Sequence, residues 1–194
     1  YNTNNQPIPA GGLLLIDAGA ERDYYTADVT RTFPADGCFS DAQKAVYNVV
    51  LEAQLASIAA STTSTTFDGV HDVSVRVLTE GLIRIGLLTG DLESLIEQGA
   101  YKRFYMHRTG HWLGMDVHDV GDYTQDGQSR LLKPGMVMTI EPGIYIAPDD
   151  AEVPEAFRGI GVRIEDNVLI TSGEPVVLTD GCPKEVDAIE SMMA

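Results

Sequence analysis

The chain has 194 residues, of which 44% are hydrophobic, and its formal net charge is -16 because 29 acidic residues stand against 13 basic ones. This acidic excess argues against a nucleic-acid partner, since a polyanion would be repelled, and the longest apolar runs are too short to span a membrane. Cys38 and Cys182 lie far apart and no secretory signal is visible, so we expect a globular protein of the reducing cytoplasm.

The first two predicted strands carry aspartates that can share one face. Leu13 to Ile16 is a short apolar run that ends at Asp17, a pattern typical of a strand entering a turn. From Ala27 to Phe33 the side chains alternate, so Asp28 and the two threonines that follow point to one face of a second strand. If these strands pair as a hairpin-like ladder joined across residues 20–25, Asp17 and Asp28 come close together.

Two helices and a shorter third one are predicted to follow. Ser40 and Gln43 form a capping-box signature, and apolar residues continue after them at helical spacing. This first helix is expected to end near the Thr/Ser cluster at residues 61–66. A second helix is expected from Asp68 to near Gly86, and a third from Leu92 to Gln98.

The second half of the chain returns to strand patterns. Met136 to Ile140 is an apolar run that ends at Glu141, and a turn at residues 133–135 precedes it. Gly161 to Thr171 alternates, with Glu165 on the face opposite its apolar residues. The order of strands, helices and strands predicts an α+β fold with one curved sheet and helices packed outside it.

Four acidic residues close or interrupt these apolar strands, and a buried carboxylate is costly unless it is paired or bound to a metal. Asp17 alone is explained as a turn cap, and Asp28 alone as a solvent-facing strand residue. Glu141 alone is explained by the Pro-Gly turn that follows it, and Glu165 by an ion pair with Arg163. The four together, beside a histidine-rich segment, predict a metal site.

Three of the four histidines, His107, His111 and His118, lie within residues 107–118. Histidine is a common metal ligand that titrates near neutral pH. Neither an HExxH motif nor paired cysteines accompany them, so the standard zinc signatures do not apply. Oxygen ligands with one imidazole suit Mn²⁺, with Co²⁺, Fe²⁺ and Zn²⁺ as alternatives, and bridging carboxylates allow two cations. The fourth histidine, His71, is interpreted as a surface or packing residue.

Five motifs in a fixed order make the chain resemble a known enzyme family. They are Ile16-Asp17-Ala18-Gly19, Ala27-Asp28-Val29-Thr30-Arg31-Thr32-Phe33-Pro34, Gly110-His111-Trp112-Leu113-Gly114 with Asp116 to Gly121, Thr139 to Tyr145, and Gly159 to Asp166. Over nearly its whole length the sequence resembles the Xaa-Pro aminopeptidase (aminopeptidase P) and prolidase group of pita-bread metallopeptidases. The resemblance implies the pita-bread fold, a curved antiparallel sheet with helices on its outer face.

The resemblance also assigns roles to individual residues. The family's metal ligands match Asp17, Asp28, His111, Glu141 and Glu165, and all five are kept. It implies two divalent ions that hold a bridging hydroxide, with Glu141 as the general base, His118 stabilising the oxyanion and His107 helping to form the proline pocket. Arg163 matches a position that orients the ligands, and Tyr145 matches one that lines the pocket.

The implied reaction is hydrolysis of the N-terminal Xaa-Pro bond of peptides with proline at the second position. One alternative is an Xaa-Pro dipeptidase, a prolidase, which shares the five ligands. Another is a non-catalytic homologue that keeps the metal as a structural clamp, although a clamp has no need of His107 or His118. The segment 107–114 looks unlike methionine aminopeptidase, which is therefore not favoured.

The resemblance further implies a domain organisation. Residues 1–194 are expected to be a C-terminal catalytic domain that lacks the first part of the pita-bread domain and an N-terminal domain. In the family a substrate-binding histidine directly precedes the segment matching Tyr1 to Asn5, so this chain is expected to lack it. The expected partners are the missing N-terminal part of the same protein and further copies of it in a homo-oligomer.

Overall fold

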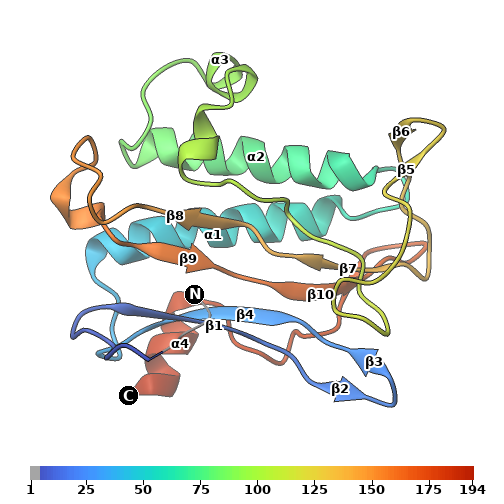
Figure 1. Cartoon of the computed structure of the whole chain (residues 1–194), viewed down its shortest axis with the longest axis horizontal. Coiled ribbons are helices and arrows are strands. Elements are labelled where there is room, and N and C mark those ends of the chain that lie inside the picture. Colours follow the sequence, from blue (N-terminus) through green and yellow to red (C-terminus); the bar gives the residue numbers. More distant parts are fainter. Residues whose placement is uncertain (1–4) are drawn as a thin grey trace.

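The computed structural model describes residues 5–194, and Figure 1 shows helices lying along short antiparallel strands. The helices are α1 (Asp41–Ala60), α2 (Phe67–Arg84), α3 (Leu92–Glu97) and α4 (Val186–Met193), with 3-10 turns η1 (Ala100–Arg103) and η2 (Glu155–Phe157). The strands are β1 (Leu13–Ala18), β2 (Glu21–Arg22), β3 (Tyr25–Thr26), β4 (Val29–Pro34), β5 (Thr124–Gln125), β6 (Gln128–Ser129), β7 (Val137–Ile140), β8 (Gly143–Tyr145), β9 (Gly161–Arg163), β10 (Asp166–Leu169) and β11 (Val176–Val177). The predicted α+β class is confirmed.

The two long helices begin as their capping residues dictate. Ser40 accepts a hydrogen bond from the backbone N–H of Gln43, and the Gln43 side chain accepts one from the Ser40 N–H, which confirms the predicted capping box of α1. Thr66 caps α2, so this helix starts one residue earlier than the predicted Asp68. Helix α4, which the sequence patterns did not indicate, buries Ile189 completely.

Strands β1 and β4 pair as predicted and set the position of the aspartates. Asp17 lies opposite Thr30 in this antiparallel ladder, and Asp28 directly precedes β4 on the same face as Thr30. The segment that joins the two strands is not a simple loop, because β2 and β3 form a small hairpin of their own within it. Within residues 5–194 the curved sheet is divided into short ladders, β1–β4, β7–β10–β11 and β8–β9.

The strand predicted over residues 161–171 is broken in the middle. β9 pairs with β8, whereas β10 pairs with β7 and β11, and Glu165 belongs to neither ladder. In this gap the Glu165 N–H donates to the Thr30 carbonyl of β4 at 3.1 Å. The prediction of one continuous strand was wrong because the backbone changes its pairing partner at Glu165.

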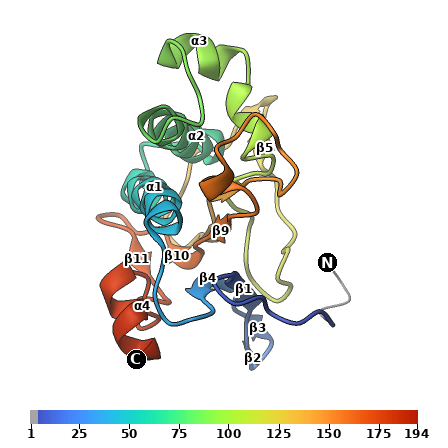
Figure 2. The same ribbon diagram turned by 90° about the vertical axis from the view of Figure 1, so that its left-hand side faces the viewer.

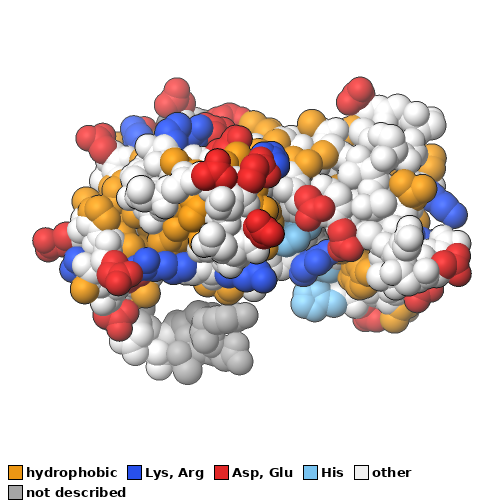
Figure 3. Space-filling model, turned by 90° about the horizontal axis from the view of Figure 1, so that it is seen from above, with side chains coloured by type: hydrophobic (Ala, Val, Ile, Leu, Met, Phe, Trp, Pro, Cys, Tyr) orange, Lys and Arg blue, Asp and Glu red, His pale blue; other side chains and the backbone are white. Residues whose placement is uncertain are grey.

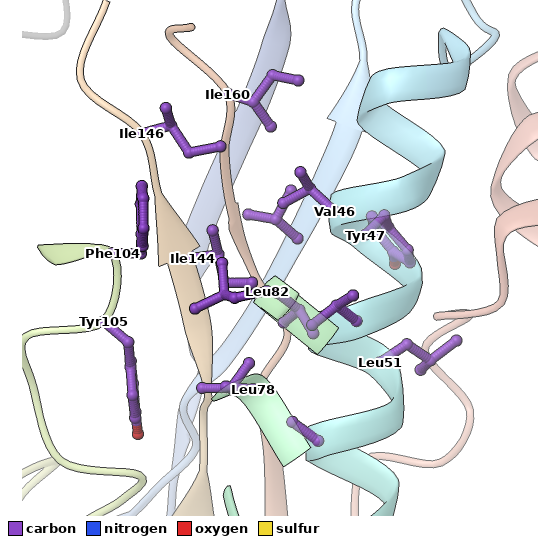
Figure 4. Packing of buried hydrophobic residues seen from close by; sticks show 14 of the residues in the cluster. Val46, Tyr47, Leu51, Leu78, Leu82, Phe104, Tyr105, Ile144, Ile146 and Ile160 are labelled. Carbon is purple, nitrogen blue, oxygen red and sulfur yellow. The ribbon is translucent and has the colours of Figure 1, made fainter. Parts of the chain in front are cut away.

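Helix α1 connects the other long helix to the strands. It packs against α2 on one side and against β7, β8 and β9 on another. Figure 2 shows α1 beside α2 and β9. Val46 of α1, Leu82 of α2 and Ile144 of β8 are fully buried together (Figure 4). Burying such side chains stabilises the fold by roughly 1.5–3 kcal/mol each.

One glycine allows α1 and α2 to approach closely. A Cβ atom on Gly81 would lie 2.2 Å from Cγ1 of Val49, well inside van der Waals contact. The helices are therefore held at a distance that only glycine permits at this crossing. None of the helices within the described residues combines the length and the apolar character needed to cross a membrane.

Candidate metal centre

The aspartates of the first two strands meet in one carboxylate cluster. Asp17 lies near the end of β1 and is exposed, whereas Asp28 is 9% exposed. Burial and the adjacent Asp28 carboxyl raise the pKa of Asp17, while Arg163 opposes this change. Because the carboxyl groups of Asp17 and Asp28 are adjacent, they are stable together only when they share a proton or a cation.

His111 reaches the same cluster from the loop that precedes β5. Its Nε2 lies 3.4 Å from Oδ2 of Asp28 and 3.5 Å from Oε1 of Glu141. Its Nδ1 lies 2.9 Å from the carbonyl oxygen of Trp112 and can donate a proton there, which leaves Nε2 free to act as a ligand. Although burial favours the neutral ring, Asp28, the Trp112 carbonyl and Glu141 raise the pKa of His111 to about 8.

Two glutamates complete the cluster from the other strands. Glu141 follows β7, where its N–H donates to the Thr109 carbonyl at 2.7 Å and its Oε1 accepts from Thr139 at 3.0 Å. Glu165 is 1% exposed, and its Oε2 accepts from the Thr30 hydroxyl at 2.5 Å. Burial and the Glu141 carboxylate raise the pKa of Glu165 to about 8.

These side chains fit a cation. One potential ligand atom from each of Asp28, His111 and Glu165 lies within 4.8 Å of the others. Among the described residues, the buried Oε1 of Glu165 has no hydrogen-bond partner. A buried carboxylate oxygen without a donor, among other carboxylates, is stabilised by a divalent cation. Asp17 and Glu141 adjoin this group, so all five predicted ligands gather in one place.

A chain of hydrogen bonds connects the cluster to the predicted pocket residues. Arg163 donates to Oδ2 of Asp17 at 2.5 Å, to the Tyr145 hydroxyl at 3.1 Å and to the Thr30 hydroxyl at 3.2 Å. Nε2 of His107 lies 2.8 Å from the same Tyr145 hydroxyl. Sequence patterns also allowed a simple ion pair between Arg163 and Glu165. In the structure the Arg163 guanidinium pairs with Asp17 instead.

The remaining histidines differ in their surroundings. His118 is exposed, and its ring lies edge-on to His111 with 4.3 Å between the ring centroids. His71 lies on α2 with its Nδ1 2.9 Å from the Thr109 hydroxyl. Burial lowers the pKa of His71 to about 4. These contacts agree with the interpretation of His71 as a packing residue.

The cluster opens into a cavity of about 930 Å³. Three of the predicted ligands line it, Asp17, His111 and Glu141, together with His107, His118 and Arg163. Its other lining residues are Phe67, Asp68, Arg108, Gly110, Tyr123 and Thr124. Figure 3 shows histidine side chains near the middle of this face, partly recessed and partly at the edge of the molecule, with acidic and basic side chains beside them.

Sequence patterns missed some residues of this site. Thr30 was placed on the face of Asp28 but was given no role, although its hydroxyl contacts both Glu165 and Arg163. Arg108 and Asp68 form an ion pair on the cavity wall, and no sequence motif indicated it. The resemblance implies that a substrate-binding histidine preceding Tyr1 is missing from this chain. This expectation falls outside the described residues, which begin at Asn5.

Comparisons with known proteins agree with this geometry. The sequence profile of metallopeptidase family M24 matches residues 1–172. The Xaa-Pro aminopeptidase of Haemophilus influenzae is 51% identical over 193 residues, which cover 100% of this chain and 44% of that protein. The solved structure of Pseudomonas aeruginosa aminopeptidase PepP superimposes with a TM-score of 0.98 at 55% identity, again over 100% of this chain and 44% of the other. Escherichia coli aminopeptidase P gives a TM-score of 0.95 at 48% identity. The chain thus spans less than half the length of these relatives.

Proposed function

The chain belongs to metallopeptidase family M24, and from that premise we propose that it carries the catalytic centre of a metal-dependent aminopeptidase. The proposed reaction is hydrolysis of the bond between the first residue of a peptide and a proline in the second position. The observation that carries this proposal is the cluster of the five predicted ligand side chains, which opens into a cavity that His107, His118 and Arg163 also line. The relatives named Xaa-Pro aminopeptidase support the substrate class.

The ligand set supports a pair of divalent cations, with Mn²⁺ as the first candidate. Asp17, Asp28, His111, Glu141 and Glu165 would hold them. Four carboxylates and one imidazole form an oxygen-rich set that suits Mn²⁺, with Co²⁺, Fe²⁺ and Zn²⁺ as alternatives. Bound cations supply Lewis-acid chemistry for peptide hydrolysis. Metal analysis of the protein at its natural length tests both the identity and the number of the ions.

The protein side chains would then divide the remaining work. Glu141 would act as the general base and pass a proton toward the proline nitrogen. His118, which is exposed at the cavity beside His111, would donate to the developing oxyanion. His107 and Tyr145, joined by their 2.8 Å contact, would form the wall against which the proline ring packs. The carboxylate of Asp17 would lie near the free α-amine of the substrate.

This arrangement answers a chemical difficulty of the substrate. Proline fixes φ and its nitrogen carries no N–H, so a peptidase that depends on donation from that group cannot use it. A site that recognises the free amine on one side and packs a ring on the other needs no such hydrogen bond. Placement of the amine near Asp17 also explains why cleavage would occur only at the N-terminus.

The size of the cavity favours an aminopeptidase over a prolidase. Its volume of about 930 Å³ lies near the upper end of the roughly 300–1,000 Å³ that hold drug-sized ligands. Phe67 and Arg108, which are not predicted ligands, line the same cavity, and we propose that they contact residues beyond proline. Comparing turnover of Gly-Pro with that of a longer Xaa-Pro peptide separates the two enzymes, and we expect the longer peptide to be the better substrate.

A variant series tests the reaction directly. In the protein at its natural length with Mn²⁺, Glu141→Gln and His111→Ala should abolish cleavage of an Xaa-Pro peptide. Glu97→Gln, on the exposed side of α3, is the matched control and should keep full activity. Turnover retained by either cavity variant would overturn the assignment, and a non-catalytic clamp would show metal binding without any hydrolysis.

We also propose that residues 1–194 are the C-terminal catalytic part of a longer protein, without the first part of the pita-bread domain and without its N-terminal domain. An apolar groove of about 600 Å³ lies on the face of β1 and β4 that points away from the metal cluster, and Ile16, Val29, Phe33 and Leu178 line it. Ile16 is 44% exposed there. Since such patches are unusual on a free surface, further chain of the same protein would cover it. Limited proteolysis of the protein at its natural length, read at β1, tests this contact.

We further propose that the protein is a homo-oligomer of the cytoplasm. The family resemblance supports a homo-oligomer, which sedimentation of the purified protein would test. Cys38 and Cys182 are free thiols, which agrees with a cytoplasmic location. Fractionation of cells would test the location.

A further inference from the structure

A buried arginine lies directly behind the carboxylate cluster. Arg31 is 3% exposed and stands between Thr30 and Thr32 on β4. Because side chains alternate along a strand, Arg31 points away from the cavity, whereas its neighbour Thr30 contacts Glu165. The proposed reaction does not use Arg31.

The guanidinium of Arg31 joins three segments of backbone. Nη1 donates to the carbonyl oxygens of Thr30 at 2.9 Å and of Glu165 at 2.6 Å. Nη2 donates to the carboxylate of Asp166 at 2.7 Å and to the Cys182 carbonyl at 2.8 Å, and Nε donates to the Pro183 carbonyl at 2.9 Å. Arginine offers several donors in a fixed planar fork, so one side chain can set the distances between all these groups.

Glu165 depends on this side chain because it lies in the break between β9 and β10. Within a ladder, its backbone groups would be paired with a neighbouring strand. Here the N–H pairs with the Thr30 carbonyl, and the carbonyl oxygen accepts from Arg31. Arg31 therefore supplies a backbone hydrogen bond that the broken strand cannot supply.

We propose that Arg31 is a positioning residue of the metal centre. It fixes the backbone of Glu165 against β4, and β4 is the strand that Asp28 directly precedes. The distance between these two carboxylates, which come from remote parts of the sequence, is thereby held at a value that suits a shared cation. The inference rests on the proposed metal centre, and it adds a residue that touches neither metal nor substrate.

A simpler role for Arg31 is to neutralise Asp166, and Lys184 separates the two roles. Asp166 is fully buried, and Nζ of Lys184 lies 2.7 Å from its Oδ2, as close as Arg31 lies to its Oδ1. The ammonium group of Lys184 donates to Asp166 and Gln54, and it makes no hydrogen bond with Glu165. Lys184→Met is thus a matched control that removes a cation from Asp166 without releasing Glu165.

The experiment is a titration with Co²⁺, followed by its visible absorption spectrum, on the protein at its natural length. Arg31→Lys and Arg31→Met should bind Co²⁺ about tenfold or more weakly, with an altered spectrum, because outer contacts of this kind govern metal affinity by 10–100-fold. Lys184→Met should lose thermal stability but keep the wild-type affinity and spectrum. Arg31→Lys keeps the charge at Asp166, so it decides the matter if Arg31→Met fails to fold.

Three results would overturn the inference. Wild-type affinity and spectrum in folded Arg31→Lys would show that Glu165 is held without the arginine fork. An equal loss of affinity in Lys184→Met would show that charge at Asp166, and not the bond to Glu165, is what matters. Failure of the wild-type protein to bind Co²⁺ at all would remove the proposed metal centre itself, which distinguishes that failure from the first two.

Discussion

Gly110 packs against Thr139 so closely that a Cβ atom on Gly110 would lie 1.9 Å from the Thr139 carbonyl oxygen. The next residue along the chain is His111, whose N–H donates to the Thr139 hydroxyl at 3.1 Å and whose carbonyl accepts from the Thr139 N–H at 2.9 Å. The absence of a side chain on Gly110 therefore determines how near the His111 backbone comes to β7.

Gly110→Ala should displace His111 from the carboxylates. The added methyl meets backbone that cannot rotate away, so we expect a loss of about 1–3 kcal/mol of unfolding free energy and a strong loss of Mn²⁺ affinity. Gly181→Ala, where the new Cβ meets nothing within 4 Å, is the control. Chemical denaturation and metal titration measure both effects, and wild-type metal affinity in Gly110→Ala would contradict the expectation.

Thr30→Val should weaken metal binding with little change in shape. Valine fills the same space but removes the hydroxyl that donates to Oε2 of Glu165. A buried acceptor left without its donor costs about 1–3 kcal/mol, so we expect roughly a tenfold or larger fall in Mn²⁺ affinity. Thr30→Ser keeps the hydroxyl and should remain close to wild type. An equal loss of affinity in Thr30→Ser, which keeps the hydroxyl, would contradict the role of this hydrogen bond.

Gly81→Ala should destabilise the protein without affecting the metal centre. Alanine is the better helix former, but here its Cβ would overlap Val49 of α1. We expect a net loss of about 1–3 kcal/mol in unfolding free energy and unchanged metal affinity. Adding Val49→Ala should relieve the overlap, so the two changes together would cost less than the sum of each alone. Additive losses in this double-mutant cycle would exclude direct contact as the reason.

His71 should make the fold sensitive to acid. Its pKa is lowered from 6.5 to about 4 by burial, so between these values the unfolded chain takes up a proton that the folded protein does not. Stability therefore falls as the pH is lowered, by at most about 1.4 kcal/mol per pH unit, and partial exposure reduces this figure. His71→Asn should lose less stability than wild type between pH 7 and pH 5, as measured by urea unfolding. Parallel curves for the two proteins would refute the role of His71.

Metal should stabilise the protein more as the pH rises. The pKa of Glu165 is raised to about 8, so after chelation the stability that this group contributes is present below the unfolded pKa of about 4.5 and is lost as the pH rises through 8. Mn²⁺ should prevent this loss because it favours the ionised carboxylate. Melting temperatures with Mn²⁺ and with chelator should differ more at pH 8 than at pH 5. A constant difference would show that Glu165 is not held in this way.

Local rules were sufficient for some parts of this fold. Ser40 and Gln43, the capping pair, lie three residues apart, so neighbouring residues alone predict where α1 begins. The shared face of Asp17 and Asp28 follows from strand alternation and one antiparallel ladder. The family motifs then indicated that His111, Glu141 and Glu165 join them, and the structure brings the five side chains together.

Other features depend on contacts that no local pattern contains. At the break, the backbone of Glu165 pairs with Thr30 and Arg31, which are far away in sequence, in place of a strand of either neighbouring ladder. Strand alternation places successive side chains on opposite faces throughout residues 161–171, so this pattern could not reveal the break at Glu165. Helix α4 is short, and Ile189 is its one fully buried side chain within the described residues. Helical spacing therefore left too weak a signal.

The order of assembly in time follows from where the ligands lie along the chain. Asp17 lies on β1 and Glu165 lies just before β10. The metal centre therefore joins residues that are far apart along the chain. Contacts between residues so distant in sequence are slow to form, because the long stretch of chain between them must first be closed into a loop. A chain still emerging from the ribosome would expose its aspartates well before Glu165 exists to join them. Tight capture of metal would thus have to wait until Glu165 has been made and has reached the aspartates.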